Sequence, residues 1–454
     1  MSMGRRRARQ EALFVMVEEL PKSAGHPFYQ KLNRLLAEAE FDRWVEDRCL
    51  PYYAQEETRG QPSIAPGLYF RMLLVGYFEG LDSQRGIAWR CADSLSLREF
   101  LGVPLEQPTP DHSTLSHTRQ RLPLEVFAEV FQFVLRVAAT KQLLSGKTVG
   151  VDSTTLEANA AMKSIVRRDT GEDWKAYVTR LMREEGVVSP EAQPTDEEIR
   201  RYDRKRKDKK VSNAEWQSAT DADSRIAQLK DGRTHLAYKA EHVVDLQSDL
   251  VLAAEIRPAD HADSQTLVDS VLAAQEHLEQ AGSTTEIEEV AADKGYHAAA
   301  ALELAASLGL RTYIPEPKRK HQARWTDKPA AYRKAVDHNR RRVRRAKGKQ
   351  LQRWRSERCE RSFAHLCDSG GTRRSWLRGL TNVTKRYLLA AAAHNLGRIL
   401  RKLCGVGKPK ALQGLAALIT RLVAWLVRRV AALDALRIWF DAYWLQAPVS
   451  VSLP

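Results

Sequence analysis

The stretch Thr148-Val-Gly-Val-Asp-Ser-Thr-Thr155 decides the fold, because the pattern of the chain changes there from helical to strand-like. Val149 and Val151 alternate with Gly150 and Asp152. Such alternation is expected when successive side chains point to opposite faces of a sheet. The segment therefore predicts a buried strand that ends at an aspartate.

The chain after this strand alternates between strand-like and helical patterns. We expect strands at 234–244 and 250–256 around a hairpin turn at 245–249, a helix at 263–280, a strand at 287–293, a helix at 298–307 and a strand at 310–314. Sequential strands followed by alternating helices and strands favour an α/β fold with a mixed sheet flanked by helices. That order is typical of the RNase H-like fold.

Residues 1–140 have helical patterns throughout and predict an all-α N-terminal domain. Tyr69, Leu73 and Tyr77 recur at helical spacing after Pro66. The segment 109–122 has a cap-like start and carries two arginines near its end. After short helices at 83–93 and 95–101, it could be the second element of a DNA-binding helix-turn-helix, with Arg119 and Arg121 reaching DNA, or an ordinary surface helix.

The catalytic region is expected at 145–400, and a helical tail at 405–454. A charged segment at about 160–225 looks inserted between the first strand and the hairpin. In the tail, leucines spaced three and four apart predict either core packing or a dimer helix.

Bulk composition restricts the partners of the protein. The 454-residue chain has a formal net charge of +15, so a polyanion is the first partner to consider. Its most apolar stretch, residues 411–426, is interrupted by Arg421, so no membrane span is predicted. The five cysteines form no C-x-x-C pair, which argues against a disulfide framework or a zinc site. We expect a cytoplasmic, nucleoid-associated protein.

Two dense basic runs lie at 200–210 and 340–361, and the second has eleven Lys or Arg in 22 residues. Such runs are either solvated surfaces or phosphate-contacting segments. If the runs contact phosphates, we expect DNA contacts by Arg204, Lys205, Arg206, Lys207, Arg341, Arg342, Arg344, Arg345, Arg355 and Arg361.

Three widely spaced carboxylates carry the predicted chemistry. Asp152 and Asp293 each follow an apolar strand run, and Glu360 lies on a basic amphipathic helix on which Phe363, Ala364 and Cys367 would face the sheet. Carboxylates seldom gather without a cation, because neighbouring like charges disfavour ionisation. Two Mg²⁺ or Mn²⁺ ions about 3.5–4 Å apart would supply the positive charge that these carboxylates need. The same ions could bind a DNA phosphodiester between them.

The chain resembles the bacterial insertion-sequence DDE transposases. The resemblance rests on Val151-Asp-Ser-Thr154, Ala292-Asp-Lys-Gly-Tyr-His297 and Glu360-Arg-Ser-Phe-Ala364, and on Arg378-Gly-Leu380 with the helix through Asn395. Upstream, Pro110-Asp-His-Ser-Thr-Leu115 is similar to the N-terminal DNA-binding domain of these enzymes. The resemblance implies an RNase H-like core, a metal-dependent Asp152/Asp293/Glu360 triad, and cleavage and strand transfer at terminal inverted repeats.

The chain departs from the family around the glutamate. The family usually has a basic residue seven positions later, where this chain has Cys367; it often has tyrosine and arginine seven and four positions earlier, where this chain has Arg353 and Ser356. Arg373, Arg374 or Lys385 could supply the missing cation, and Arg373 and Arg374 are also expected to contact DNA. Glu357 is the rival glutamate, because Arg353 precedes it by four residues.

The expected function is therefore a DNA transposase that acts on double-stranded DNA, at its inverted repeats and target, as a dimer. Two alternatives stay open: a catalytically impaired or domesticated DNA-binding protein, and a nuclease that cuts without joining.

Overall fold

The computed structural model describes residues 25–53, 63–207, 211–229, 232–318, 325–326 and 328–409. The basic N-terminal residues and the predicted helical tail beyond residue 409 lie outside the described residues.

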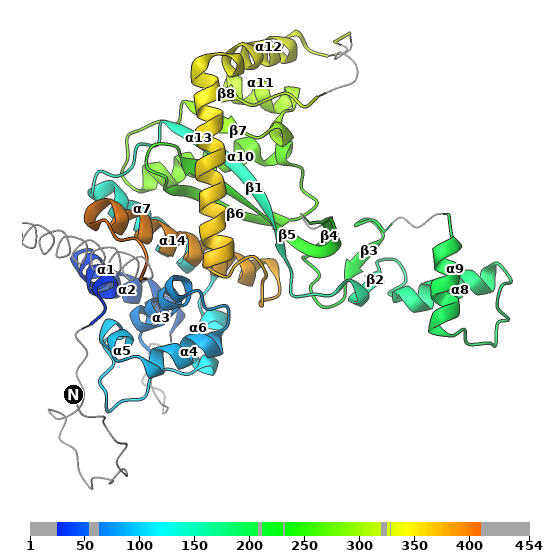
Figure 1. Ribbon diagram of the computed structural model, residues 1–454, viewed down its shortest axis with the longest axis horizontal. Coiled ribbons are helices and arrows are strands. Elements are labelled where there is room, and N and C mark those ends of the chain that lie inside the picture. The colour runs from blue at the N-terminus through cyan, green and yellow to red at the C-terminus, as the bar shows by residue number, and fades with distance from the viewer. Residues whose placement is uncertain are drawn as a thin grey trace, which may run out of the picture.

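A six-stranded mixed sheet forms the core of the part of the chain that follows the N-terminal helices (Figure 1). Its strands are β1 (Thr148–Glu157), β4 (Arg225–Gln228), β5 (Thr234–Asp245), β6 (Val251–Pro258), β7 (Glu289–Ala292) and β8 (Arg311–Tyr313). Strand β5 runs antiparallel to β1, β4 and β6, whereas β1, β7 and β8 are parallel neighbours. This arrangement confirms the RNase H-like mixed sheet predicted from the sequence.

Strand β1 is longer than its sequence pattern predicted. It continues through Glu157 because β5 supplies backbone partners from Asp245, opposite Val149, to Ala237, opposite Glu157. The prediction that the strand ends at Asp152 was therefore wrong, and this residue lies in the middle of a paired strand.

Helices cover both faces of the sheet. Those after β6 are α10 (Asp263–Gln280), η4 (Lys294–Tyr296), α11 (Ala299–Ser307), α12 (Ala330–Arg344), α13 (Ala346–Phe363) and α14 (Leu380–Cys404). Helix α13 crosses the sheet and ends in the π turn η5 (Ala364–Ser369) (Figure 1). The predicted helices at 263–280 and 298–307 are confirmed.

The N-terminal helices are α1 (Pro27–Glu38), α2 (Phe41–Cys49), η2 (Leu50–Tyr52), α3 (Pro66–Glu79), α4 (Gln84–Asp93), α5 (Leu95–Leu101), α6 (His112–Arg121) and α7 (Leu124–Thr140). Buried Arg71 joins several of them by donating to Asp42, Asn33 and the Phe100 carbonyl. Helix α7 packs against α14, so these helices share one continuous apolar core with the sheet.

None of the described helices is both long and apolar enough to cross a bilayer. All five cysteines are free thiols.

The predicted insertion is a folded projection, which we call the arm and define as residues 162–218 (Figure 1). It contains η3 (Met162–Ser164), the paired strands β2 (Ile165–Arg167) and β3 (Trp216–Ser218), and helices α8 (Trp174–Glu184) and α9 (Asp196–Lys205). Val178, Met182 and Ile199 form a small apolar core of its own. The basic run 200–210 therefore begins within a capped helix.

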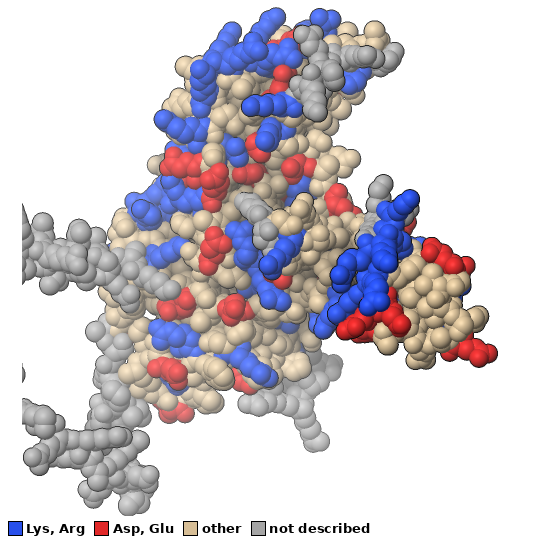
Figure 2. All heavy atoms as spheres, turned by 45° about the vertical axis from the view of Figure 1, so that its right-hand side comes forward, with Lys and Arg blue, Asp and Glu red and all other residues tan. Residues whose placement is uncertain are grey.

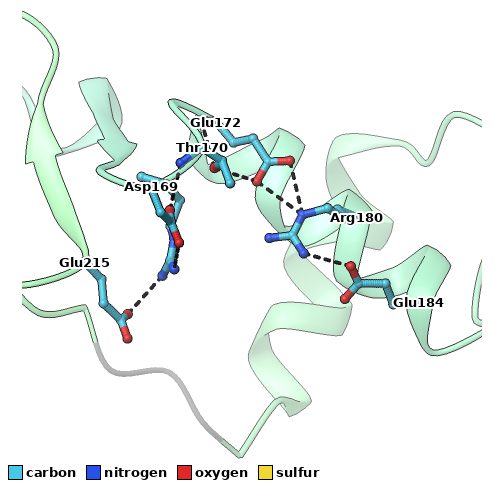
Figure 3. A network of polar contacts seen from close by, with 7 residues as sticks. Asp169, Thr170, Glu172, Arg180, Glu184 and Glu215 are labelled. Carbon is cyan, nitrogen blue, oxygen red and sulfur yellow. Dashed lines mark hydrogen bonds and ion pairs between the residues drawn. The ribbon is translucent and has the colours of Figure 1, made fainter.

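Ion pairs tie the arm together beside this small core. Arg180 joins Glu172 to Glu184, and Arg167 joins Asp169 to Glu215 near β3 (Figure 3). These pairs link segments up to 48 residues apart.

The base of the arm is bound to the segment just before α14. The Glu157 amide donates to the Arg373 carbonyl at 2.9 Å, and the Ser375 amide donates to the Glu157 carbonyl at 2.8 Å. On the returning strand side, Asp221 accepts from the Gly379 amide at 3.2 Å and from the Tyr238 hydroxyl at 2.6 Å. Both connections of the arm therefore meet the same part of the sheet.

Candidate active site

Two aspartates lie side by side on the central parallel strands. Strands β1 and β7 pair in register up to Val151 and Ala292, so Asp152 and Asp293 occupy the next position on each. The Asp152 side chain is 18 % exposed and accepts from the Ser153 amide at 2.9 Å, whereas the Asp293 side chain is 48 % exposed. The structure thus brings together two residues that are 141 positions apart in the sequence.

The guanidinium of Arg355 lies between the two carboxylates. Its Nη1 is 3.0 Å from Oδ2 of Asp152, and its Nη2 is 3.8 Å from Oδ1 of Asp293. Burial raises the pKa of Asp152 above its ordinary value, the Arg355 charge lowers it, and the neighbouring Asp293 raises it again. The positive charge of Arg355 therefore offsets the repulsion between the two neighbouring carboxylates.

Helix α13 approaches the sheet closely because Gly150 lacks a side chain. A Cβ added at Gly150 would lie 3.1 Å from both Cγ of Arg355 and Sγ of Cys359. As predicted, Gly150 and Asp152 share one face of β1, and this face is the one that α13 covers. Of the residues predicted to face the sheet from the end of α13, Phe363 and Cys367 are buried, but Ala364 is exposed.

Glu360 is exposed near the C-terminal end of α13. Gln352, Ser356 and Glu360 follow one another at steps of four, which places them along one ridge of the helix. Gln352 donates to the Ala292 carbonyl at 3.2 Å, beside Asp293, and Ser356 donates to Oε1 of Glu360 at 2.8 Å. The N-terminal residue of this ridge, Gln352, therefore lies beside the residue that precedes Asp293.

Glu357 lies on a different ridge and pairs with Arg361, which in turn pairs with Asp249 at 3.1 Å on the far side of the helix. Glu360 does not contact either aspartate. Within the part of the chain that the structure describes, no group of three His, Cys, Asp or Glu side chains is close enough to hold a metal ion.

A buried imidazole fixes α13 against the sheet. His242 lies on β5 opposite Asp152, and its ring stacks on Phe363 at 4.0 Å between centroids. Its Nδ1 is 2.8 Å from the Ser362 hydroxyl, and its Nε2 is 2.8 Å from the Tyr387 hydroxyl of α14. Burial lowers the pKa of His242 to about 3, so the ring is neutral.

The structure distinguishes three candidates for the basic side chain that the resembled family usually has at the position of Cys367. Arg373 donates from Nη1 to the Thr154 hydroxyl at 3.2 Å, two residues beyond Asp152 on the same face of β1. Arg374 is 3.6 Å from Glu157 and largely exposed. Lys385 is buried and donates to the carbonyls of Arg119 and Leu122, so it has a structural role.

The predicted DNA-contacting arginines of α6 differ in their surroundings. Arg119 is half-buried and its guanidinium lies over the Trp376 ring at 5.5 Å, so its DNA contact stays a prediction. Arg121 is exposed at the end of α6, where it donates to Ser63 and lies over Tyr53. Helices α4 and α6 pack together, with α5 between them in the chain, and the helix-turn-helix stays a prediction.

The other predicted contacts divide in the same way. Arg204, Lys205, Lys207, Arg341, Arg344, Arg345 and Arg374 are exposed, and Arg373 is partly exposed. Arg206 instead pairs with Asp203, and Arg342 donates to the Thr312 carbonyl at 3.0 Å. Arg361 pairs with Asp249, and Arg355 is held by the aspartates. These four side chains have protein partners in the structure, and their contacts with DNA stay predictions.

The sequence interpretation missed how His242 and Arg355 act. No local pattern singles out His242, and Arg355 falls within the basic run 340–361. The available signal was the antiparallel pairing of β5 with β1, which places His242 opposite Asp152 once the register is known.

Comparison with known families gives two matches. Residues 16–121 match the family described as Transposase domain (DUF772), and residues 316–400 match the family described as Transposase DDE domain. The first range covers the N-terminal helices through α6, and the second covers α12, α13 and most of α14, including Glu360. Strands β1 and β7 lie between the two ranges. No curated protein and no solved structure matches the chain.

Proposed function

The two matches support an insertion-sequence DDE transposase, and we propose that this DNA transposase cleaves the terminal inverted repeats of its element and joins the ends to target DNA through Asp152, Asp293 and Glu360. The observation that carries the proposal is the parallel pairing of β1 and β7, which sets Asp152 beside Asp293.

Divalent metal ions fit the chemistry of these residues. Asp152 and Asp293 both direct carboxylate oxygens at one cation, the Arg355 guanidinium, and hard oxygen ligands are those that Mg²⁺ and Mn²⁺ prefer. When bound, two such ions would activate an oxygen nucleophile and neutralise the leaving oxygen of a phosphodiester. Asp152 and Asp293 would hold them in place of Arg355, and Glu360 would complete the ligand set.

Each residue of the triad has a distinct role in this proposal. Asp152 sits on a strand paired on both sides, so it gives the fixed reference point of the site. Asp293 follows β7 on the exposed side, where DNA can reach it. Glu360 is on a helix that ends at a π turn three residues later, and this end of α13 would have to turn for Glu360 to reach the aspartates.

We place the DNA across the site and along the arm. Lys and Arg side chains cover the side of the arm nearest the rest of the molecule, whereas Asp and Glu gather mainly at its outer end and lower edge (Figure 2). Strand β1 runs from Asp152 to Glu157 at the base of the arm, a distance of about 17 Å at 3.3 Å per residue. Arg373 and Arg374 lie along this path, and exposed Arg204, Lys205 and Lys207 would continue it with phosphate contacts.

Recognition of the element's ends falls to residues 1–140 in this proposal, with Arg121 at the exposed end of α6. Residues 145–400 carry catalysis, and 405–454 form a tail. A dimer would bring two ends together at the nucleoid in the cytoplasm. Arg341, Arg344 and Arg345, at the junction of α12 and α13, supply a second basic surface for target DNA.

The test is a nicking and joining assay on DNA that carries the element's own ends. We expect nicking only with Mg²⁺ or Mn²⁺, and we expect Asp152→Asn and Asp293→Asn to abolish it while DNA binding is retained, since both lie apart from the exposed basic surfaces. Cleavage that persists in EDTA or in either variant would overturn the proposal. Nicked ends that never join would identify a nuclease, and binding without nicking would identify a DNA-binding protein.

A further inference from the structure

The turn that carries Asp293 is anchored on the face of the sheet opposite the aspartates. Tyr296 closes this turn three residues after Asp293 and is 1 % exposed. Its hydroxyl donates to Oε2 of Glu241 at 2.7 Å. Tyr296, in the same segment as Asp293, thus binds a buried carboxylate on the other face of the sheet.

Glu241 lies on β5 and is itself fully enclosed. It is 1 % exposed and accepts from the Thr266 hydroxyl at 2.7 Å and from the Ser270 hydroxyl, both on α10. A buried carboxylate is costly unless its oxygens are hydrogen-bonded. Three neutral hydroxyls satisfy the Glu241 carboxylate, and Tyr296 supplies one of them. The hydrogen bond that helps to make the burial of Glu241 tolerable therefore also fixes the position of Tyr296.

Further polar contacts on this face of the sheet hold the residue that follows Asp152. Ser153, the residue after Asp152, pairs with Glu241 across the strands and donates to Oδ1 of Asp263 at 2.8 Å. Asp263 forms an ion pair with buried Lys239. The residues that follow both candidate catalytic aspartates are therefore held by one polar cluster, which we call the rear cluster: Ser153, Lys239, Glu241, Asp263, Thr266, Ser270 and Tyr296.

Gly295 shows how tightly the turn is seated. A Cβ added to it would lie 2.7 Å from Oδ2 of Asp263, closer than real Cβ atoms approach. A side chain at position 295 would therefore force either the turn or the Asp263 carboxylate to move.

We infer that Tyr296 and Glu241 are positioning residues that set the spacing between Asp152 and Asp293 and thereby tune their affinity for divalent metal ions. This inference rests on the proposed function, because it assumes that the two aspartates hold metal. Neither residue touches the metal side of the sheet. Residues that orient metal ligands from behind typically change metal affinity by about 10- to 100-fold when they are replaced.

The chain contains a matched control for a purely structural role. Tyr313 on β8 is also buried, and its hydroxyl donates to Oε1 of buried Glu289 at 3.0 Å. Glu289 is the first residue of β7, whereas Asp293 follows the last, so the two tyrosine–glutamate pairs lie at opposite ends of one short strand. Replacing either tyrosine by phenylalanine removes one hydroxyl from a buried carboxylate, but only Tyr296 is in the Asp293 turn.

The experiment compares full-length wild type, Tyr296→Phe and Tyr313→Phe by calorimetric titration with Mn²⁺ and by thermal unfolding without metal. We expect both variants to unfold at lower temperature, and Tyr296→Phe alone to bind Mn²⁺ about tenfold or more weakly. Gly295→Ala, which keeps the hydroxyl but displaces the turn, should weaken Mn²⁺ binding as well and serves if Tyr296→Phe does not fold. Equal Mn²⁺ affinities in the two tyrosine variants and Gly295→Ala would overturn the inference.

Asp152→Asn, titrated in parallel, distinguishes this failure from failure of the proposed function. If Asp152→Asn weakens Mn²⁺ binding while Tyr296→Phe does not, the metal site stands and the positioning role is wrong. If Asp152→Asn binds Mn²⁺ as wild type does, the metal is not held by the aspartates, and both the metal assignment and the positioning role are wrong.

Discussion

Arg355 donates from Nη1 to Oδ2 of Asp152 at 3.0 Å, and this ion pair lies where the proposed metal ions would bind. The guanidinium is 11 % exposed, so it is largely withdrawn from solvent together with its partner. A protein cation thus offsets the repulsion between two adjacent carboxylates when no metal is bound. Metal binding then becomes an exchange of one cation for another.

Removing this cation should therefore strengthen metal binding. We expect Arg355→Gln to bind Mn²⁺ about tenfold more tightly, a difference of about 1.4 kcal/mol, and to unfold at lower temperature without metal, because the carboxylates then repel each other. Calorimetric titration and thermal unfolding measure the two effects. Arg353→Gln, an exposed arginine on the same helix, is the control. Weaker Mn²⁺ binding by Arg355→Gln would show that Arg355 organises the ligands.

The two glutamates of α13 can be separated by single substitutions. Glu360→Gln should abolish DNA nicking, because Glu360 lies on the ridge that starts beside Asp293. Glu357→Gln should retain most of the nicking and lose at most about 0.3–0.5 kcal/mol of stability, the usual contribution of an exposed ion pair on a helix. The nicking assay with unfolding curves for both variants decides between them. An inactive Glu357→Gln beside an active Glu360→Gln would reverse the assignment.

The buried imidazole predicts a dependence of stability on pH. The pKa of His242 falls to about 3 in the folded chain, below its ordinary value in the unfolded chain. The unfolded state therefore binds the extra proton first, so this stabilisation is complete above about pH 6.5 and is lost as pH falls toward 3, by about 1.4 kcal/mol per pH unit.

His242→Gln keeps a donor and an acceptor between Ser362 and Tyr387 but does not titrate. Its free energy of unfolding in urea should fall less steeply than that of wild type between pH 6 and pH 4. The exposed His338→Gln is the control and should follow the wild-type curve. Parallel curves for wild type and His242→Gln would contradict a neutral buried His242.

The arm should contribute to DNA affinity without choosing the sequence. Lys205→Ser/Lys207→Ser should reduce the slope of log affinity against log salt by up to about 1.8, at about 0.9 for each phosphate contact, and should weaken all duplexes alike. Lys175→Ser/Arg183→Ser removes the same charge from α8 and should leave the slope unchanged. Fluorescence anisotropy over a salt series measures both. A changed preference between end sequences in the first variant would contradict this division of labour.

Local patterns predicted the order of the elements well. The hairpin at Asp245, helix α10 and the placement of Asp293 directly after β7 depend on neighbouring residues, and the structure has them where alternation and helical spacing indicate. The extent of β1 depends on its pairing with β5, about 90 residues later, and no local pattern contains that information. The roles of Arg355 and Tyr296 depend in the same way on distant partners: Asp152 for the first, Glu241 for the second.

The charged insertion shows a different limit. Its high charge concealed two helices, because their stability rests on a small core around Val178 and on ion pairs such as that of Arg180 with Glu172. A small number of buried apolar residues is enough to stabilise the arm because cation–aromatic contacts contribute as well. One of these contacts places Arg167 over the ring of Tyr177.

The self-contained build of the arm makes it an exchangeable part. Both of its ends leave the molecule at one place, anchored by Glu157 on one side and Asp221 on the other. Val178, Met182 and Ile199 form a core of their own in its outer part, whereas Ile165 and Trp216 at its base belong to the main core. An arm of another length or charge could be grafted at these two points without altering the register of β1 against β5 or β7. The reach of the protein along DNA is thus open to change independently of the chemistry that the sheet supports.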